Sequence, residues 1–301
     1  MNLFSKLQVR AAASDPLRIA IIGAGKFASM YLAQVHKTPG VHVSAIIDLN
    51  PENAHKSLQR VGWKREQYDA RSLDDAMKLD HTWVTDEWQK VVTDPRIDIV
   101  VEATGNPPAA VEHILHALSH RKHVVNVTVE ADALCGPYLA RCAQQNNVIY
   151  SLAYGDQPAL ICDLVDWARA SGFRVVSAGR GHKWMPHFAQ STPETVWGHY
   201  GLTPEQAERG GLNPKMFNSF LDGSKPAIES VAVCNATGLL APPDGLEYPS
   251  GSIDDIPNLM RPKAVGGCLH HDGQVEVVSS LDSSGAPIPY DILYGVWVVF
   301  E

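Results

Sequence analysis

A glycine-containing turn between an apolar run and a helical pattern constrains this chain more than any other feature. Residues 17–22 predict a strand covered on both faces, and residues 26–37 predict a helix. The junction between them contains the six residues Gly23-Ala24-Gly25-Lys26-Phe27-Ala28. Such a turn lets the backbone approach a pyrophosphate, and the N–H groups of the helix terminus face the phosphates. We therefore predict that this loop binds a dinucleotide; the alternative is an ordinary glycine turn.

An acidic residue stands where a dinucleotide site needs one. Asp48 follows Ala28 by 20 residues and ends the second predicted strand, 41–47. A carboxylate there can accept hydrogen bonds from an adenosine ribose and repels a 2′-phosphate, so it favours NAD. Lys26 or Lys56 could still approach such a phosphate. The choice between NADH and NADPH therefore stays open.

Apolar runs alternate with helical patterns through about the first 150 residues. The predicted strands lie at 17–22, 41–47, 82–85, 97–103, 123–129 and 148–153. This alternation predicts an α/β fold with a Rossmann-type, doubly wound parallel sheet, which we place at residues 1–155.

The end of the 97–103 strand is a second candidate for cofactor contact. Thr104 and Gly105 follow it directly, and ligands bind outside the carboxyl ends of strands in such sheets. These residues could border the nicotinamide, or serve only the start of the helix that follows Asn106-Pro107.

Residues 156–301 have a different pattern and predict a second, α+β domain. A long helical pattern covers 213–237, despite Gly223 and Pro226. Short strands are predicted at 173–179, 264–269, 274–280 and 292–300. The apolar end at 296–301 has no polar tail, which predicts that this domain is truncated at its C-terminus.

The composition excludes several classes of protein. The 301 residues carry a net charge of −8, which argues against a nucleic-acid or anionic-membrane binder. The five cysteines have no zinc-type spacing, and no apolar run is long enough to cross a bilayer. Without a secretory signal, the chain is expected in the cytoplasm.

Four segments resemble a known family. They are 100–105 (VVEATG), 123–131 (HVVNVTVEA), 155–160 (GDQPAL) and 213–239, which begins NPKMFNSFLDGSK. Together they are similar to the homoserine-dehydrogenase-like oxidoreductases, and most similar to the 1-deoxy-D-xylulose 5-phosphate reductoisomerase-like branch. The resemblance implies a homodimer with a substrate and dimerisation domain that continues into a C-terminal SAF-like region.

The same resemblance implies an activity. Members of the branch convert 1-deoxy-D-xylulose 5-phosphate to 2-C-methyl-D-erythritol 4-phosphate with NADPH, a step of isoprenoid biosynthesis. The alternatives are a homoserine-dehydrogenase-type or sugar-acid dehydrogenase and, in another class, a dinucleotide-binding sensor without catalysis. The family's lysine after the fifth strand is missing from 126–130, and its Asp–Lys pair is spaced by three residues here rather than four.

That pair is the first candidate for catalysis. Hydride transfer leaves negative charge on a carbonyl oxygen, so a proton or positive charge is needed there. We expect Lys225 to supply it, Asp222 to hold Lys225, and Glu229 to orient Lys225 or bind a substrate hydroxyl. The alternative is an exposed ion pair on a helix, worth only about 0.3–0.5 kcal/mol.

Basic residues after the 173–179 strand predict a site for a substrate anion, either phosphate or carboxylate. They are Arg180, His182 and Lys183, with Lys215 as a weaker candidate. A basic surface loop is the alternative interpretation.

A divalent metal, magnesium or manganese, is also possible for a reductoisomerase. Glu130, Asp156 and Glu229 are the carboxylates that could hold it, although the sequence alone leaves the metal ligands unknown. We interpret His113, His116 and His120 as a solvated helix face.

Overall fold

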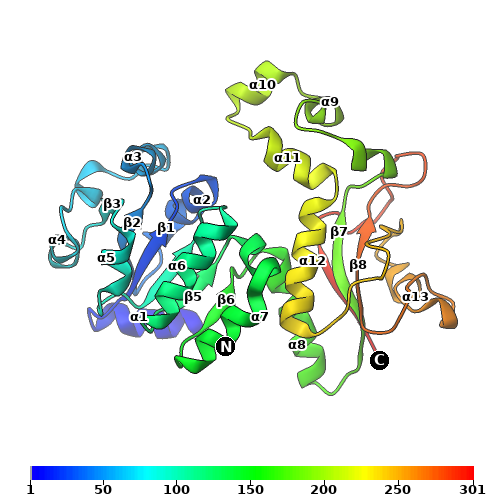
Figure 1. The fold of residues 1–301 in the computed structure, drawn as a ribbon, viewed down its shortest axis with the longest axis horizontal. Helices are drawn as coiled ribbons and strands as arrows, with labels where there is room; N and C mark the ends of the chain where they lie inside the picture. Colours follow the sequence, from blue (N-terminus) through cyan, green and yellow to red (C-terminus); the bar gives the residue numbers. More distant parts are fainter. Residues whose placement is uncertain (1) are drawn as a thin grey trace. The chain divides into compact units, whose positions relative to one another are not determined.

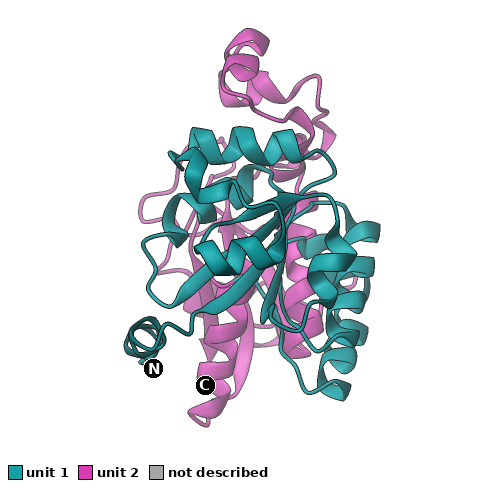
Figure 2. Cartoon of the chain, turned by 90° about the vertical axis from the view of Figure 1, so that its left-hand side faces the viewer, with its two compact units in different colours: residues 1–153 teal, residues 154–301 magenta. Residues whose placement is uncertain are grey.

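The computed structural model describes residues 2–301. The chain forms two compact units, residues 1–153 and 154–301 (Figure 2). Within the described residues, no helix is both long and apolar enough to span a lipid bilayer.

A six-stranded parallel sheet forms the centre of the first unit (Figure 1). Its strands are β1 (Leu17–Ile22), β2 (Val41–Ile47), β3 (Trp83–Thr85), β4 (Ile99–Glu102), β5 (His123–Asn126) and β6 (Tyr150–Leu152). They lie in the order β3-β2-β1-β4-β5-β6, so the strand order reverses between β1 and β4. In open sheets of this kind, ligands bind outside the carboxyl ends of the strands at that reversal.

Helices cover both faces of this sheet. They are α1 (Leu3–Ala12), α2 (Lys26–Val35), α3 (Pro51–Arg60), η1 (Arg65–Tyr68), α4 (Leu73–Leu79), α5 (Trp88–Thr93), α6 (Pro107–Ser119) and α7 (Val129–Gln145). Successive side chains of β1 point to opposite faces. Ala20 and Ile22 pack with α6 and α7, whereas Ile19 and Ile21 pack with α2 and α3. The predicted doubly wound α/β fold is confirmed.

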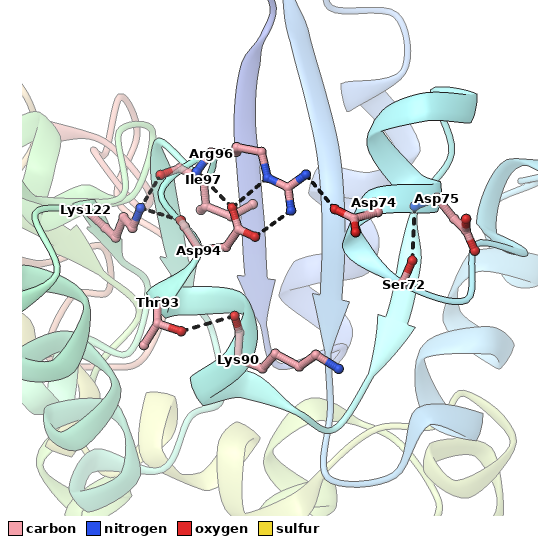
Figure 3. Close-up of polar contacts among 9 residues, drawn as sticks. All are labelled: Ser72, Asp74, Asp75, Lys90, Thr93, Asp94, Arg96, Ile97 and Lys122. Atoms are coloured by element: carbon pink, nitrogen blue, oxygen red, sulfur yellow. Dashed lines mark hydrogen bonds and ion pairs between the residues drawn. The ribbon is translucent and has the colours of Figure 1, made fainter.

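Charged side chains tie together the loops at the amino ends of β4 and β5 (Figure 3). Arg96 donates to both carboxylate oxygens of Asp94, at 2.9 and 2.6 Å, and to Asp74 at 2.7 Å. Lys122 is only 4% exposed and donates to the carbonyl oxygens of Asp94 and Ile97. This network stabilises the amino-terminal edge of the sheet. The cofactor is expected at the opposite edge, outside the carboxyl ends of the strands.

The second unit contains a three-stranded sheet in the order β8-β7-β9. Its strands are β7 (Val175–His182), β8 (Gln274–Ser279) and β9 (Val296–Phe300). β7 pairs in parallel with β8 and antiparallel with β9, so the sheet is mixed. Helices α8 (Gln157–Ala170) and α12 (Ser224–Thr237) pack against it through an apolar core that includes Ile161, Val233 and Val275.

Short helices make up much of the rest of this unit. They are η2 (Pro186–Gln190), α9 (Val196–Tyr200), α10 (Pro204–Arg209), α11 (Pro214–Leu221), α13 (Ile256–Leu259) and η3 (Lys263–Val265).

Two of the predicted elements are wrong, and a glycine interrupts each. The predicted helix 213–237 is two helices, because Gly223 lies between α11 and α12 with a φ of +86°. The predicted strand 264–269 is instead the short helix η3 followed by Gly266, which has a φ of +88°. A left-handed backbone conformation ends a helix and is incompatible with a regular strand.

Candidate cofactor and substrate sites

Gly23 stands at the reversal of strand order and permits a close backbone contact there. Its φ is +98°, and its N–H donates to the carbonyl oxygen of Ile47 at 2.7 Å. A Cβ atom at this position would lie 2.6 Å from the carbonyl oxygen of Ala103, which follows β4. Only glycine therefore allows the loop after β1 to lie against the loop after β4.

Gly25 and the start of α2 leave room for a ligand. A Cβ atom at Gly25 would have no atom within 4 Å, apart from its own neighbours in the chain. Lys26 and Phe27 are exposed, whereas Ala28 is buried and lets α2 pack closely. The N–H groups of a first helical turn have no partner inside the helix and attract anions. These residues fit a dinucleotide pyrophosphate.

Asp48 is half-buried and is held by backbone donors. Its Oδ2 accepts a hydrogen bond from the N–H of Ala24 at 2.9 Å, and its Oδ1 accepts one from Asn50 at 3.0 Å. The carboxylate thus lies beside the glycine loop, where the sequence predicts that it meets the ribose.

Thr104 and Gly105 are fixed by buried side chains. The Thr104 hydroxyl donates to Oε1 of Glu102 at 2.5 Å, and the N–H of Gly105 donates to the Thr128 hydroxyl at 3.0 Å. Asn106 caps α6 by accepting a hydrogen bond from Ala109 at 3.2 Å. Hydrogen bonds therefore hold the loop after β4 in place at the carboxyl end of the strand, which is compatible with both roles considered for it.

Sequence reasoning missed Glu102, which is fully buried at the end of β4. Its Oε1 lies 3.4 Å from Nδ1 of His113, whose ring packs on Trp88. The interpretation of His113 as part of a solvated face is wrong, because it is 9% exposed and points to the sheet. An acid inside an otherwise apolar stretch near the end of the predicted strand 97–103 was the available signal for Glu102.

In the second unit, β7 directs Arg180 and His182 to the same face of its sheet. The residues on either side of Arg180 are glycines, because a Cβ at Gly179 or Gly181 would lie within 2 Å of a backbone oxygen. Arg180 is 4% exposed and forms an ion pair with Glu229 of α12, which is 3% exposed. The positive charge of Arg180 is thus balanced by the buried carboxylate of Glu229.

His182 is buried beside Arg180 and donates through Nε2 to the carbonyl oxygen of Phe220. Burial lowers the pKa of His182 to about 4, and the positive charge of Arg180 acts in the same direction. The imidazole is therefore neutral near pH 7. The other predicted anion-binding residues, Lys183 and Lys215, are exposed.

Glu229 lies among charged groups. Burial raises the pKa of its carboxyl group, Arg180 and Lys225 lower it, and Asp156 raises it. Lys225 is half-buried in the first turn of α12. Asp222 lies just before that helix and accepts hydrogen bonds from the N–H of Ser224 and from Nδ2 of Asn218, both at 2.8 Å. The residues predicted for catalysis thus come from the start of one helix.

An aromatic pair that sequence reasoning missed covers the break before α12. The Trp184 and Tyr248 rings stack with centroids 4.3 Å apart and an angle of 19°. The Tyr248 hydroxyl donates to the carbonyl oxygen of Gly223 at 3.0 Å, and a Cβ at Gly223 would lie 2.8 Å from that hydroxyl. Buried Glu276 holds Tyr248 in place by accepting a hydrogen bond from its N–H at 3.4 Å. No local pattern signals this contact.

A metal centre is not preformed in the part of the chain that the structure describes. Among residues 2–301, no three His, Cys, Asp or Glu side chains are grouped so that they could hold a metal ion. Of the carboxylates considered, Glu130 belongs to the first unit, and Asp156 and Glu229 belong to the second.

Two family models together match most of the chain. Residues 17–126 match an oxidoreductase family with an NAD-binding Rossmann fold. Residues 155–301 match the catalytic domain of the oxidoreductase DRL.

Individual relatives are similar to parts of the chain. A homoserine dehydrogenase of Synechocystis sp. is 38% identical over 80 residues, which are 26% of this chain and 18% of that enzyme. An NAD-binding oxidoreductase of Klebsiella pneumoniae has a similar structure, with 18% identity, a TM-score of 0.38, and coverage of 57% of this chain and 44% of that one. A DOX-P reductoisomerase in complex with magnesium aligns with 10% identity, a TM-score of 0.48, and coverage of 74% of this chain and 58% of that one. The chain therefore spans 18% of the curated relative and between 44% and 58% of these two solved chains.

Proposed function

We propose that this chain is an NAD-binding oxidoreductase that reduces the carbonyl group of a phosphorylated sugar. The specific reaction we propose is the conversion of 1-deoxy-D-xylulose 5-phosphate to 2-C-methyl-D-erythritol 4-phosphate. In this reaction one C–C bond of the sugar breaks and another forms to give a branched aldehyde, and the hydride then reduces that aldehyde. The observation that carries the proposal is the charged group of Lys225, Glu229 and Arg180 at the start of α12 and the end of β7, within the segment that matches an oxidoreductase catalytic domain.

The first unit would hold the dinucleotide. Gly25 and the first turn of α2 would bind the pyrophosphate, and Asp48 would accept hydrogen bonds from the ribose. Thr104 and Gly105 would border the nicotinamide, which supplies the hydride when bound. Asp48 carries negative charge beside the loop, so we expect NADH to bind more tightly than NADPH.

The second unit would supply the proton. Negative charge develops on the carbonyl oxygen as hydride arrives, and an ammonium group can neutralise it by donating a proton. In this proposal Lys225 is the donor. Asp222 fixes the backbone at the start of α12, and Glu229 balances the charges of Lys225 and Arg180.

A phosphate group on the substrate needs cations that are not already paired inside the protein. Arg180 is buried against Glu229, and His182 is neutral near pH 7. The exposed residues Lys183 and Lys215 are therefore the candidates that we retain for binding the phosphate.

The experiment uses the full-length protein with 1-deoxy-D-xylulose 5-phosphate and either NADH or NADPH. Loss of reduced-nicotinamide absorbance is followed with and without magnesium or manganese. We expect loss that depends on the sugar phosphate, and each metal arm reports whether the reaction needs that ion. If the protein binds the dinucleotide but no such loss occurs, this substrate assignment fails.

A second candidate function has an observation of its own. The segment of 80 residues that is 38% identical to a homoserine dehydrogenase favours oxidation of homoserine. Homoserine with NAD⁺ or NADP⁺, assayed on the same preparation, distinguishes the two. Turnover of homoserine alone would replace the sugar phosphate as the substrate.

A further inference from the structure

Two buried serines and an arginine lie directly beneath the glycine loop. Ser29 belongs to α2 and Ser57 to α3, and they are 6% and 5% exposed. Arg60 is the last residue of α3, and its Nη2 donates to the Ser29 hydroxyl at 2.6 Å and to the Ser57 hydroxyl at 3.2 Å. Ser57 and Arg60 are three residues apart, so one face of α3 presents both to the loop.

Each serine hydroxyl accepts a hydrogen bond from Arg60 and donates one to a carbonyl oxygen of the loop. The Ser57 hydroxyl donates to the carbonyl oxygen of Ala24 at 2.8 Å, and the Ser29 hydroxyl donates to that of Gly25 at 3.0 Å. A serine has one hydroxyl proton, and a guanidinium NH₂ group has two. With both protons of Nη2 directed to the serines, each serine proton can be directed to one carbonyl oxygen, and the two hydroxyl oxygens themselves lie 3.3 Å apart.

This arrangement directs the N–H groups of the loop. In a trans peptide the C=O and the following N–H point in opposite directions. Because the carbonyls of Ala24 and Gly25 point toward the serines, the N–H groups of Gly25 and Lys26 point away from them. A Cβ at Gly25 would have no atom within 4 Å, so the backbone at this position is open to a ligand. The N–H of Ala24 donates to Oδ2 of Asp48 and is therefore not available to a ligand.

We propose that Ser57 and Arg60 are positioning residues that hold the glycine loop in its dinucleotide-binding conformation before the cofactor arrives. The inference rests on the proposed binding of a dinucleotide at this loop. Charge assistance from the guanidinium makes each serine a stronger donor, and a loop that is already ordered loses less entropy on binding. Neither residue touches the cofactor in this account.

The test compares Ser57→Ala and Arg60→Met with the control Gln59→Ala, an exposed position on the same helix. In the full-length protein, fluorescence titration gives the Kd for NADH and for NADPH. We expect both variants to raise the Kd by about 10-fold, because a hydrogen bond that involves a charged group is lost. The factor is the same for NADH and NADPH, and the control leaves both values unchanged.

A second measurement needs no cofactor and separates this inference from the proposed function. Hydrogen exchange of residues 23–29 in the cofactor-free protein should be faster in Ser57→Ala than in the wild type, and unchanged in Gln59→Ala. Unchanged exchange and unchanged Kd values overturn the inference. A loss restricted to NADPH in Arg60→Met also overturns it for Arg60, because that residue would then bind the 2′-phosphate directly. A wild-type protein that binds neither dinucleotide would instead refute the proposed function, while the exchange measurement would still report on the loop.

Discussion

Arg180 and Glu229 are 49 residues apart in the sequence and form a buried ion pair that joins β7 to α12. Both side chains are less than 5% exposed, so neither charge is hydrated. The pair therefore holds the start of α12, where Lys225 lies, against the end of the strand.

Breaking this pair should destabilise the second unit. Glu229→Gln leaves the Arg180 guanidinium buried without a counter-charge, and we expect a loss of about 3–5 kcal/mol in the free energy of unfolding. Urea denaturation followed by circular dichroism measures it. The double variant Arg180→Met/Glu229→Leu should regain most of the loss because no charge stays buried. A loss below about 1 kcal/mol in Glu229→Gln would mean that solvent reaches the pair.

The stability of the protein should fall as the pH is lowered through the range set by His182. The folded-state pKa is about 4 and the ordinary value is 6.5, so below pH 6.5 the unfolded chain takes up a proton that the folded protein does not. The part of the free energy of unfolding that depends on His182 is greatest above pH 6.5 and is lower by about 2 kcal/mol at pH 5. Unfolding free energies at pH 7 and pH 5 measure it.

The comparison of His182→Gln with the exposed control His199→Gln isolates this contribution. The variant at 182 should lose the part of the pH dependence described above, and the control should keep it. Equal pH dependence in the wild type and in His182→Gln would contradict a buried neutral imidazole.

The two glycines of the loop should respond differently to alanine. Gly23→Ala places a Cβ 2.6 Å from a backbone oxygen at a φ of +98°, and we expect a stability loss of about 2–3 kcal/mol. Gly25→Ala meets no protein atom, so its stability should change by less than about 0.5 kcal/mol. Its Cβ instead fills the space beside the helix terminus, so binding of NADH should weaken at least about 10-fold.

Thermal unfolding and NADH titration of both variants check this contrast. If the Gly25→Ala protein is stable and binds NADH as tightly as the wild type, the pyrophosphate does not bind beside Gly25.

Replacement of Lys225 should affect chemistry more than cofactor binding. We expect Lys225→Ala to lower kcat by about 10²–10⁴-fold, because a general acid is lost, while the Kd for NADH stays the same. Steady-state kinetics with the sugar phosphate and a separate NADH titration measure the two quantities. Arg209→Ala removes an exposed charge from the same unit and serves as the control. Full turnover by Lys225→Ala would end its assignment as the proton donor.

Patterns within a few residues of one another were enough to predict the first unit. The apolar run of β1, the Gly23–Ala28 turn and the helix after it are contiguous, and each depends on backbone preferences and periodicity that act locally. The position of Asp48 at the end of β2 followed from the same alternation. The assigned roles of these residues, like those of Lys225 and Lys215, stay predictions.

Local sequence patterns did not predict the break in the helical segment 213–237 or the burial of His113. A helical pattern of 25 residues over 213–237 concealed the break at Gly223, because a single glycine is tolerated inside a helix and can also end one. In the structure Gly223 has a left-handed conformation, and the hydroxyl of Tyr248, 25 residues away, donates to its carbonyl oxygen. The burial of His113 was missed for a similar reason, since Trp88 and Glu102 enclose it from other elements.

The sequence by itself determined the alternation of strands and helices, the glycine loop and the acid at the end of β2, because these depend on neighbours along the chain. Only the tertiary structure decided that Arg180 is neutralised by Glu229, that His182 is uncharged, and that Ser57 and Arg60 lie under the loop. Burial and pairing set the charge and the direction of a polar side chain, and both arise from contacts between segments that are distant in sequence.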